Sequence, residues 1–180
     1  ILLTQEIYNG DMRFQKKQFK SFSELQKELG FEYAAFAPTF EEDSDELSND
    51  GKLLRVIQGN AVFSKFSLEE VATIFYDVPF GGRDPYDATQ YHITPRNLQH
   101  VTTLIGTKKL HILNTQGIWG EHGGDTPRRL EMAEKILSEV GENAPLVLAG
   151  DFNVHEKTQT VDTLREKLVS VFYGEMQSSF

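Results

Sequence analysis

The sequence of 180 residues contains no cysteine, so the chain can form neither a disulfide nor a thiolate metal site. It also lacks any run of the roughly 18 apolar residues that a membrane-spanning helix needs. The first residues do not show the basic, apolar and small-residue succession of a signal peptide. These absences predict a soluble protein whose location stays open, with a slight preference for the cytoplasm.

Positive charge is scarce, because 18 Lys and Arg residues stand against 27 Asp and Glu residues, a formal net charge of -9. This balance disfavours tight nonspecific binding to nucleic acid, which depends on cations that neutralise phosphates. A polyanionic substrate would need local cations or a bound metal. Much of the excess lies in residues 41–51, which we interpret as a solvated polar loop because their spacing is not that of a calcium loop.

Internal repeats, low-complexity segments and Pro/Ser-rich linkers are also absent, which favours a single domain over residues 1–180. Helical spacing predicts helices over 21–29 and 127–140 and from Thr160 onward. Apolar runs predict strands at 1–3, 31–36, 98–105, 110–115 and 145–149, and we interpret 53–64 and 68–76 as adjacent strands. Strands outnumber helices, so we expect a sheet sandwich with outer helices.

The last predicted strand ends in Gly150, Asp151, Phe152 and Asn153. An extended backbone sends residues two apart to the same side, so Asp151 and Asn153 would look out together from a strand's carboxyl end. The same residues are also ordinary turn formers after a strand. From these residues alone, the interpretations as a turn and as a functional site both remain open.

Three further polar residues stand beside apolar strands, namely Glu6, Arg96 and Gln116. Two of them have a plain structural alternative: Glu6 as a surface carboxylate and Arg96 as a salt-bridged residue at a sheet edge. His92, His100, His111 and His122 lack metal-ligand spacing. We interpret the first three as sheet or surface residues, whereas His122, in a glycine-rich loop, is a candidate for substrate contact. Trp119 in the same loop has two interpretations, a ring that stacks on a base or sugar and an anchor of the loop.

Six segments occur in an order that resembles the endonuclease/exonuclease/phosphatase superfamily, with its DNase I-like fold. They are ILLTQE at 1–6, GNAVFSK at 59–65, Arg96 before a strand, LNTQG at 113–117, RRL at 128–130 and LAGDFN at 148–153. The resemblance extends over nearly the whole sequence. It implies an α/β (α+β) fold, a four-layer sandwich of two facing, mainly antiparallel sheets flanked by helices.

The resemblance further implies a hydrolase that cleaves phosphoesters with a divalent metal, Mg²⁺ or Mn²⁺. Glu6 would be the metal ligand, since Mg²⁺ prefers carboxylate oxygen. Asp151 would orient or deprotonate the attacking water, Asn153 would donate an amide hydrogen to the phosphate, and Arg96 would hold phosphate oxygens. A phosphoester, with nucleic acid among the candidates, is the implied substrate, and no obligate protein partner is implied.

Gln116 departs from the family, which usually carries a histidine or tyrosine at this position. Glutamine can donate to a phosphoryl oxygen, but it cannot carry charge or transfer a proton near neutral pH. The closing Asp-His pair and the opening strand of the family are also missing, so we expect a fragment, incomplete at both ends, that is slow or disabled as an enzyme.

Three alternatives remain at this stage. They are a non-catalytic binding relative of the same fold, a phosphatase of small phosphorylated molecules or lipid headgroups, and an unrelated α/β domain. Substrate choice would depend on the loops at 41–51, 79–95 and 117–126.

Overall fold

The computed structural model describes residues 1–83, 87, 89, 93–120, 122–141 and 144–171, and it contains two four-stranded sheets. The first sheet, sheet A, has the strand order β1 (Leu2–Tyr8), β3 (Leu53–Ser64), β2 (Tyr33–Leu47) and β5 (Gly81–Arg83). The second, sheet B, has the order β4 (Leu68–Phe75), β6 (Asn97–Ile105), β7 (Lys108–Gln116) and β8 (Leu146–Asp151). Only β2–β5 and β7–β8 pair in parallel among the described strands.

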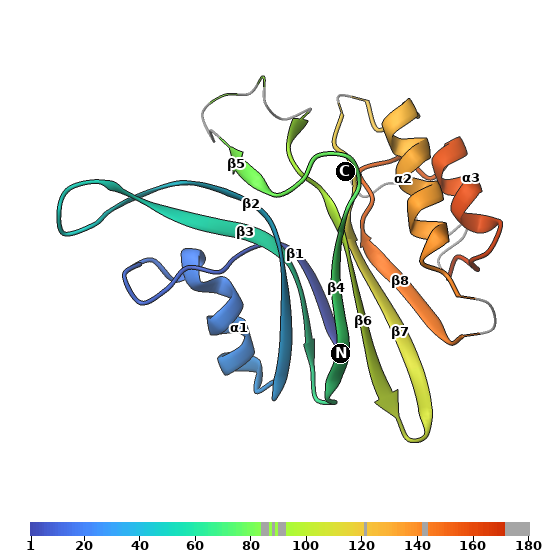
Figure 1. Ribbon diagram of the computed structural model, residues 1–180, viewed down its shortest axis with the longest axis horizontal. Coiled ribbons are helices and arrows are strands. Elements are labelled where there is room, and N and C mark those ends of the chain that lie inside the picture. Colours follow the sequence, from blue (N-terminus) through green and yellow to red (C-terminus); the bar gives the residue numbers. More distant parts are fainter. Residues whose placement is uncertain (84–86, 88, 90–92, 121, 142–143, 172–180) are drawn as a thin grey trace.

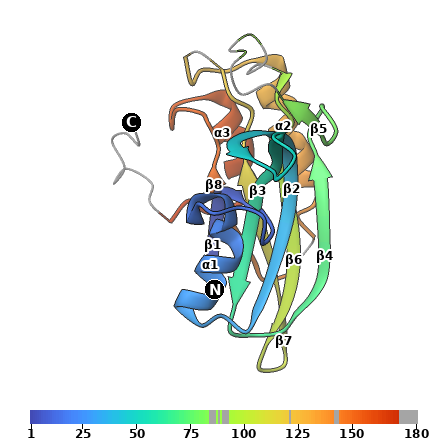
Figure 2. The ribbon, with the colours of Figure 1, turned by 90° about the vertical axis from the view of Figure 1, so that its left-hand side faces the viewer.

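Helices cover the outer faces of both sheets, as Figures 1 and 2 show. A short 3₁₀ helix, η1 (Lys17–Lys20), leads into α1 (Ser21–Leu29) beside sheet A, and α2 (Pro127–Ser138) and α3 (Gln159–Arg165) lie beside sheet B. The order of layers is therefore helix, sheet, sheet, helix. The expected four-layer α/β sandwich of two facing, mainly antiparallel sheets is confirmed.

Three layers of apolar side chains hold this sandwich together. Phe63 and Ala61 of β3 pack under Phe22 and Leu25 of α1, while Met132 and Ile136 of α2 belong to the core that covers sheet B. Between the sheets, one buried cluster combines Val62, Val101 and Ile112. Burial of these side chains favours the facing arrangement of the two sheets.

Polar side chains also join the two sheets inside the sandwich. Asn60 of β3 donates from Nδ2 to Oδ1 of Asn97 at 2.9 Å, and Asn114 of β7 donates to the carbonyl oxygens of Thr4 and Ala61, each at 3.1 Å. Buried amides need such partners, because an unpaired amide in the interior costs free energy. These hydrogen bonds therefore fix how the end of β1 faces sheet B.

The acidic segment 41–51 is only in part the solvated loop that its composition predicts, because the exposed turn is confined to residues 48–51. Residues 41–47 continue β2, which pairs with β3 down to Leu47 and Leu53. Glu42 is buried and accepts a hydrogen bond from the hydroxyl of Tyr8 at 2.9 Å, and Glu46 accepts the backbone N–H of Gln15 at 2.6 Å. The prediction was wrong for residues 41–47, because these carboxylates have partners distant in sequence.

The strands at 53–64 and 68–76 are not neighbours, contrary to the interpretation from sequence. β3 pairs with β1 and β2 in sheet A, whereas β4 pairs with β6 in sheet B. The segment between them passes from one sheet to the other. By contrast, the predicted hairpin of β6 and β7 is confirmed, with Gly106 in its turn at φ 64°.

His100 and His111 lie side by side in sheet B, as predicted for sheet residues. Their Nε2 and Nδ1 atoms are 2.9 Å apart, and Nδ1 of His100 is 3.3 Å from a carboxylate oxygen of Glu139. His92 lies outside the described residues. None of the helices in the described part of the chain is long and apolar enough to cross a membrane.

Candidate active site

The parallel strands β7 and β8 end side by side, and their last residues pair in register. Gln116 lies opposite Asp151, and the next N–H along β7, that of Gly117, donates to the Asp151 carbonyl at 2.7 Å. Gly150 permits this close approach, because a Cβ there would lie 2.0 Å from the carbonyl oxygen of Thr115. The strand pairing therefore brings Gln116 and Asp151 to one edge of sheet B.

Asp151 and Asn153 form a turn directly after β8. The Asp151 carboxylate accepts the backbone N–H of Asn153 at 2.9 Å, and Nδ2 of Asn153 donates to the carbonyl of Gly117 at 3.0 Å. This Asx-type turn is the turn that the sequence of residues 150–153 predicts. It also leaves the Asp151 carboxylate exposed at the strand ends. The turn and the functional interpretation are therefore compatible.

Glu6 reaches the same place from sheet A. The β1–β3 register shifts between Thr4 and Ile7, and the side chain of Glu6 accepts a hydrogen bond from Nε2 of Gln116 at 2.6 Å. Gln116 is only 1% exposed, and its buried Oε1 has no hydrogen-bond partner among the described residues. A carboxylate of one sheet and an amide of the other thus meet across the sandwich.

Glu6 and Asn153 share an unusual backbone conformation. They are the two non-glycine residues of the described chain with positive φ, and both have a φ of 55°. Side chains other than glycine pay a steric cost in this region, less for asparagine than for glutamate. Strained residues of this kind cluster at functional sites. The strain therefore marks the same edge that the strand pairing and hydrogen bonds define.

The strain at Glu6 predicts that a glycine variant is more stable than an alanine variant, which is the reverse of the usual order in a strand. Glu6→Gly should unfold with a free energy about 1 kcal/mol higher than Glu6→Ala, because only alanine retains the steric cost of positive φ. Both variants lose the hydrogen bond from Gln116, so their difference isolates the backbone. Urea denaturation of the two variants measures it.

Glu69 is the matched control, because it is an exposed glutamate in β4 without positive φ. There Glu69→Gly should be the less stable variant, since glycine weakens a regular strand. Equal stabilities of Glu6→Gly and Glu6→Ala would show that the conformation of Glu6 stores no strain.

Arg96 lies just before β6, at the same end of sheet B, but its guanidinium is directed inward. The side chain is buried, Nη1 donates to the Pro95 carbonyl at 3.2 Å, and the guanidinium carbon lies 6.0 Å from the centre of the Phe40 ring. Phe40 belongs to β2 of sheet A. The structure therefore brings Glu6, Gln116, Asp151 and Asn153 together and places Arg96 beside Phe40.

Two residues to which the sequence pattern gave no role organise the neighbouring loops. Arg129 of α2 is buried and donates to the carbonyls of Ile118, Gly120 and Gly124. Burial lowers the pKa of its guanidinium, and the nearby Asp125 partly opposes that shift. The backbone N–H of His155 donates to the Gly123 carbonyl at 2.7 Å, which ties the loop after β8 to the loop after β7.

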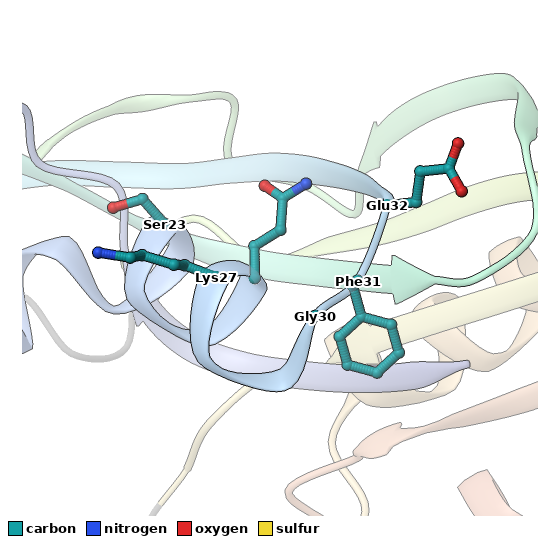
Figure 3. A pocket seen from close by; sticks show the side chains of 6 residues that line it. Ser23, Lys27, Gly30, Phe31 and Glu32 are labelled. Carbon is teal, nitrogen blue, oxygen red and sulfur yellow. The ribbon is translucent and has the colours of Figure 1, made fainter.

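A surface hollow lies at the other end of sheet A. It is lined by Ser23, Gln26, Lys27, Gly30, Phe31 and Glu32, at the end of α1 and the approach to β2 (Figure 3). This end adjoins the start of β1, because Leu2 and Ala34 both pair with Phe63. Glu6 lies toward the opposite end of β1, so the hollow is separate from the candidate active site.

The sequence matches the model of a known protein family. The sequence model of the Endonuclease/Exonuclease/phosphatase family matches residues 1–167. No curated protein sequence matches the chain significantly.

Solved structures share the fold at low sequence identity. An endonuclease/exonuclease/phosphatase from Beutenbergia cavernae has a TM-score of 0.58 and 18% identity, and the match covers 86% of this chain and 38% of that one. A family protein from Bacteroides thetaiotaomicron has a TM-score of 0.51 and 20% identity, with coverage of 81% and 50%. D. rerio TDP2, complexed with single strand DNA product, has a TM-score of 0.53 and 13% identity, with coverage of 91% and 50%.

This chain therefore spans half or less of the length of these three structures. The family match, in contrast, covers nearly all of the sequence, including the strand ends that carry Glu6, Gln116, Asp151 and Asn153. The chain belongs to the Endonuclease/Exonuclease/phosphatase family.

Proposed function

We propose that this protein is a divalent-metal-dependent phosphoesterase whose substrates are phosphodiesters, with nucleic acid as the first class to test. The observation that carries the proposal is the meeting of Glu6 and Gln116 across the two sheets, beside the exposed carboxylate of Asp151. Positive φ at Glu6 and Asn153 supports it, because the fold maintains a strained backbone at this edge. D. rerio TDP2, which shares the fold, was captured with a single strand DNA product.

The donor chemistry of the site fits Mg²⁺ or Mn²⁺. No group of three or more His, Asp or Glu side chains in the described part of the chain would hold a metal by itself. Mg²⁺ does not need such a cage, because it commonly binds one or two carboxylates and completes its shell with water and phosphate oxygens. Glu6 would hold the ion, and the ion would supply Lewis-acid stabilisation of charge on the phosphoryl group.

Gln116 would position Glu6. Its Nε2 donates to Oε1 of the carboxylate at 2.6 Å, which fixes the orientation of Glu6 and leaves the other carboxylate oxygen for a metal. Hydrogen bonds of this kind from residues behind a ligand commonly affect metal affinity by 10–100-fold. Gln116 has no proton to transfer near neutral pH, so it takes no part in acid–base chemistry.

Asp151 and Asn153 would act on the water and the phosphate. The Asp151 carboxylate would accept a proton from the attacking water, whose oxygen then bonds to phosphorus while the ester P–O bond breaks. The leaving oxygen would take its proton from solvent. Asn153 uses one amide hydrogen for the Gly117 carbonyl, and its second would be available to a phosphate oxygen. Arg96, buried beside Phe40, would stabilise the negative charge from behind rather than by direct contact.

A binding function without catalysis is the second candidate. Gln116 favours it, because a neutral amide occupies a position where the family usually has a histidine or tyrosine. The net charge of -9 keeps small phosphorylated molecules and lipid headgroups among the possible ligands, since they demand fewer cationic contacts than a nucleic acid strand.

A panel of substrates with a matched metal-ligand variant tests the proposal. Single- and double-stranded DNA, RNA, a small phosphodiester and a phosphomonoester are assayed with Mg²⁺, with Mn²⁺ and with a chelator. We expect metal-dependent hydrolysis, and in Glu6→Gln a requirement for at least about tenfold more Mg²⁺, because the amide preserves the contact with Gln116 but loses the charge. Glu69→Gln, at an exposed strand glutamate, should leave the metal requirement unchanged.

Thermal unfolding with and without Mg²⁺ gives a readout that does not depend on turnover. Metal bound to the folded state raises the melting temperature, and Glu6→Gln should abolish that increase. A shift that depends on Glu6 without hydrolysis of any substrate would support the binding relative. The absence of both hydrolysis and a Glu6-dependent shift would refute the proposed function.

A further inference from the structure

Trp119 is the single tryptophan of the sequence, and it is exposed directly beside the candidate active site. It follows Gly117, whose carbonyl accepts the amide of Asn153 at 3.0 Å, by two residues. Two residues of chain span at most about 7 Å, so the backbone of Trp119 lies close to the strand ends. Its 43% exposure contrasts with Ile118, which is 3% exposed and belongs to the core under α2.

The backbone around Trp119 is held on both sides by the same buried side chain. Arg129 donates from Nε to the Ile118 carbonyl at 2.9 Å and from Nη2 to the Gly120 carbonyl at 3.4 Å. Burial of a guanidinium is costly, and the cost is recovered only when its hydrogen bonds are made. The buried Arg129 side chain therefore fixes the positions of the two residues that flank Trp119.

The next turn of the loop is fixed as well. Asp125 accepts the backbone N–H of Thr160 at 2.9 Å and its hydroxyl at 2.7 Å, which ties the loop to the start of α3. The hydrogen bond from Thr160 is the main reason that the pKa of Asp125 is lowered. Ile118 is buried in the core under α2 and anchors the loop there.

We propose that Trp119 is a stacking platform for an unpaired nucleobase next to the phosphate that Asn153 would contact beside Asp151. This inference rests on the proposed function and names its substrate class as single-stranded nucleic acid. An exposed aromatic ring on a fixed backbone binds a base face at little cost in entropy. Stacking also suits a protein with a net charge of -9, because it contributes affinity that does not depend on phosphate neutralisation.

The single tryptophan makes the contact directly measurable. The Asp151→Asn protein with Mg²⁺ is titrated with a short single-stranded oligonucleotide, with an abasic strand of equal length and with the mononucleotide, and indole fluorescence is recorded. The base-containing strand should quench the fluorescence and bind about tenfold more tightly than the abasic strand. The mononucleotide should quench more weakly, because a single nucleotide makes fewer contacts with the protein than the strand does. Equal quenching by the abasic strand would overturn the proposal.

Variants of Trp119 distinguish a stacking contact with a base from a structural role of the side chain. In fluorescence anisotropy with a labelled oligonucleotide, Trp119→Ala should weaken binding by about tenfold and Trp119→Phe should restore most of it. Phe66→Ala is the matched control. Phe66 is 45% exposed, but it follows the end of β3 that lies away from the candidate active site, so affinity should not change. Unchanged affinity in Trp119→Ala would overturn the proposal even if the protein cleaves nucleic acid. Base-dependent quenching without cleavage would support it even if the proposed hydrolysis fails.

Discussion

Asp151→Asn should lower kcat/KM for phosphodiester hydrolysis by roughly 10²–10⁴-fold, the usual contribution of a positioned general base. The substitution is nearly isosteric. The asparagine carbonyl oxygen can still accept the backbone N–H of Asn153, which the carboxylate accepts at 2.9 Å, so the turn after β8 should persist. Stability should therefore change little while activity is lost. Steady-state kinetics with Mg²⁺ and urea denaturation measure the two effects on the same protein.

Two companion variants define what the loss means. Asp151→Ala removes both the proton acceptor and the turn hydrogen bond, so it should lose stability as well as activity. Asp162→Asn alters an exposed carboxylate of α3 that pairs with Arg165 at 3.3 Å, and it should leave the rate within about twofold. Retention of more than about half of the activity by Asp151→Asn would exclude Asp151 as the proton acceptor.

Local patterns predicted the elements whose stabilisation is local. Helix α2 followed from its helical spacing and proline at the first position, and the β6–β7 hairpin followed from alternation around Gly106. The family resemblance, which rests on the order of short motifs, predicted the facing sheets and the set of polar residues at the strand ends. These features needed no knowledge of which strands meet.

The failures concern partners that are distant along the chain. Glutamate is depleted in strands, so local sequence does not favour a strand at Glu42. Glu42 lies in β2 because the segment pairs with β3, and its carboxylate accepts a hydrogen bond from Tyr8, which lies 34 residues away. Residues 64–67 contain nothing that distinguishes a turn within one sheet from a passage between two. Arg96 was placed correctly at a strand start, but its inward direction depends on Phe40 of the other sheet.

The candidate site shows the same division. Asp151 and Asn153 are close in sequence, and their shared edge followed from the extended backbone. Glu6 and Gln116 are separated by 110 residues, and only the structure shows that they touch. Positive φ at Glu6 had no signal in the sequence, because glutamate is not a residue that favours this region. The strain arises from the register shift in β1, which depends on pairing with β3.

Gln116→His should increase phosphodiester hydrolysis by about a hundredfold. Gln116 is buried at the end of β7 and its amide touches Glu6, so an imidazole at this position would be oriented by the same carboxylate. A protonated imidazole can donate a charge-assisted hydrogen bond to the phosphoryl group as negative charge develops, and such donors are commonly worth 10²–10³ in rate. The neutral amide supplies no such charge.

The pH profile distinguishes this explanation from a general improvement in packing. The active form of the introduced imidazole carries a proton, and the ordinary pKa of histidine is about 6.5. The rate gain should therefore be complete at low pH and should disappear as pH rises through the pKa of this imidazole. Gln116→Asn, which keeps an amide but shortens it, should show no gain at any pH. If the histidine variant folds normally and its rate stays at that of the parent between pH 5 and 9, the neutral amide at position 116 does not limit this enzyme.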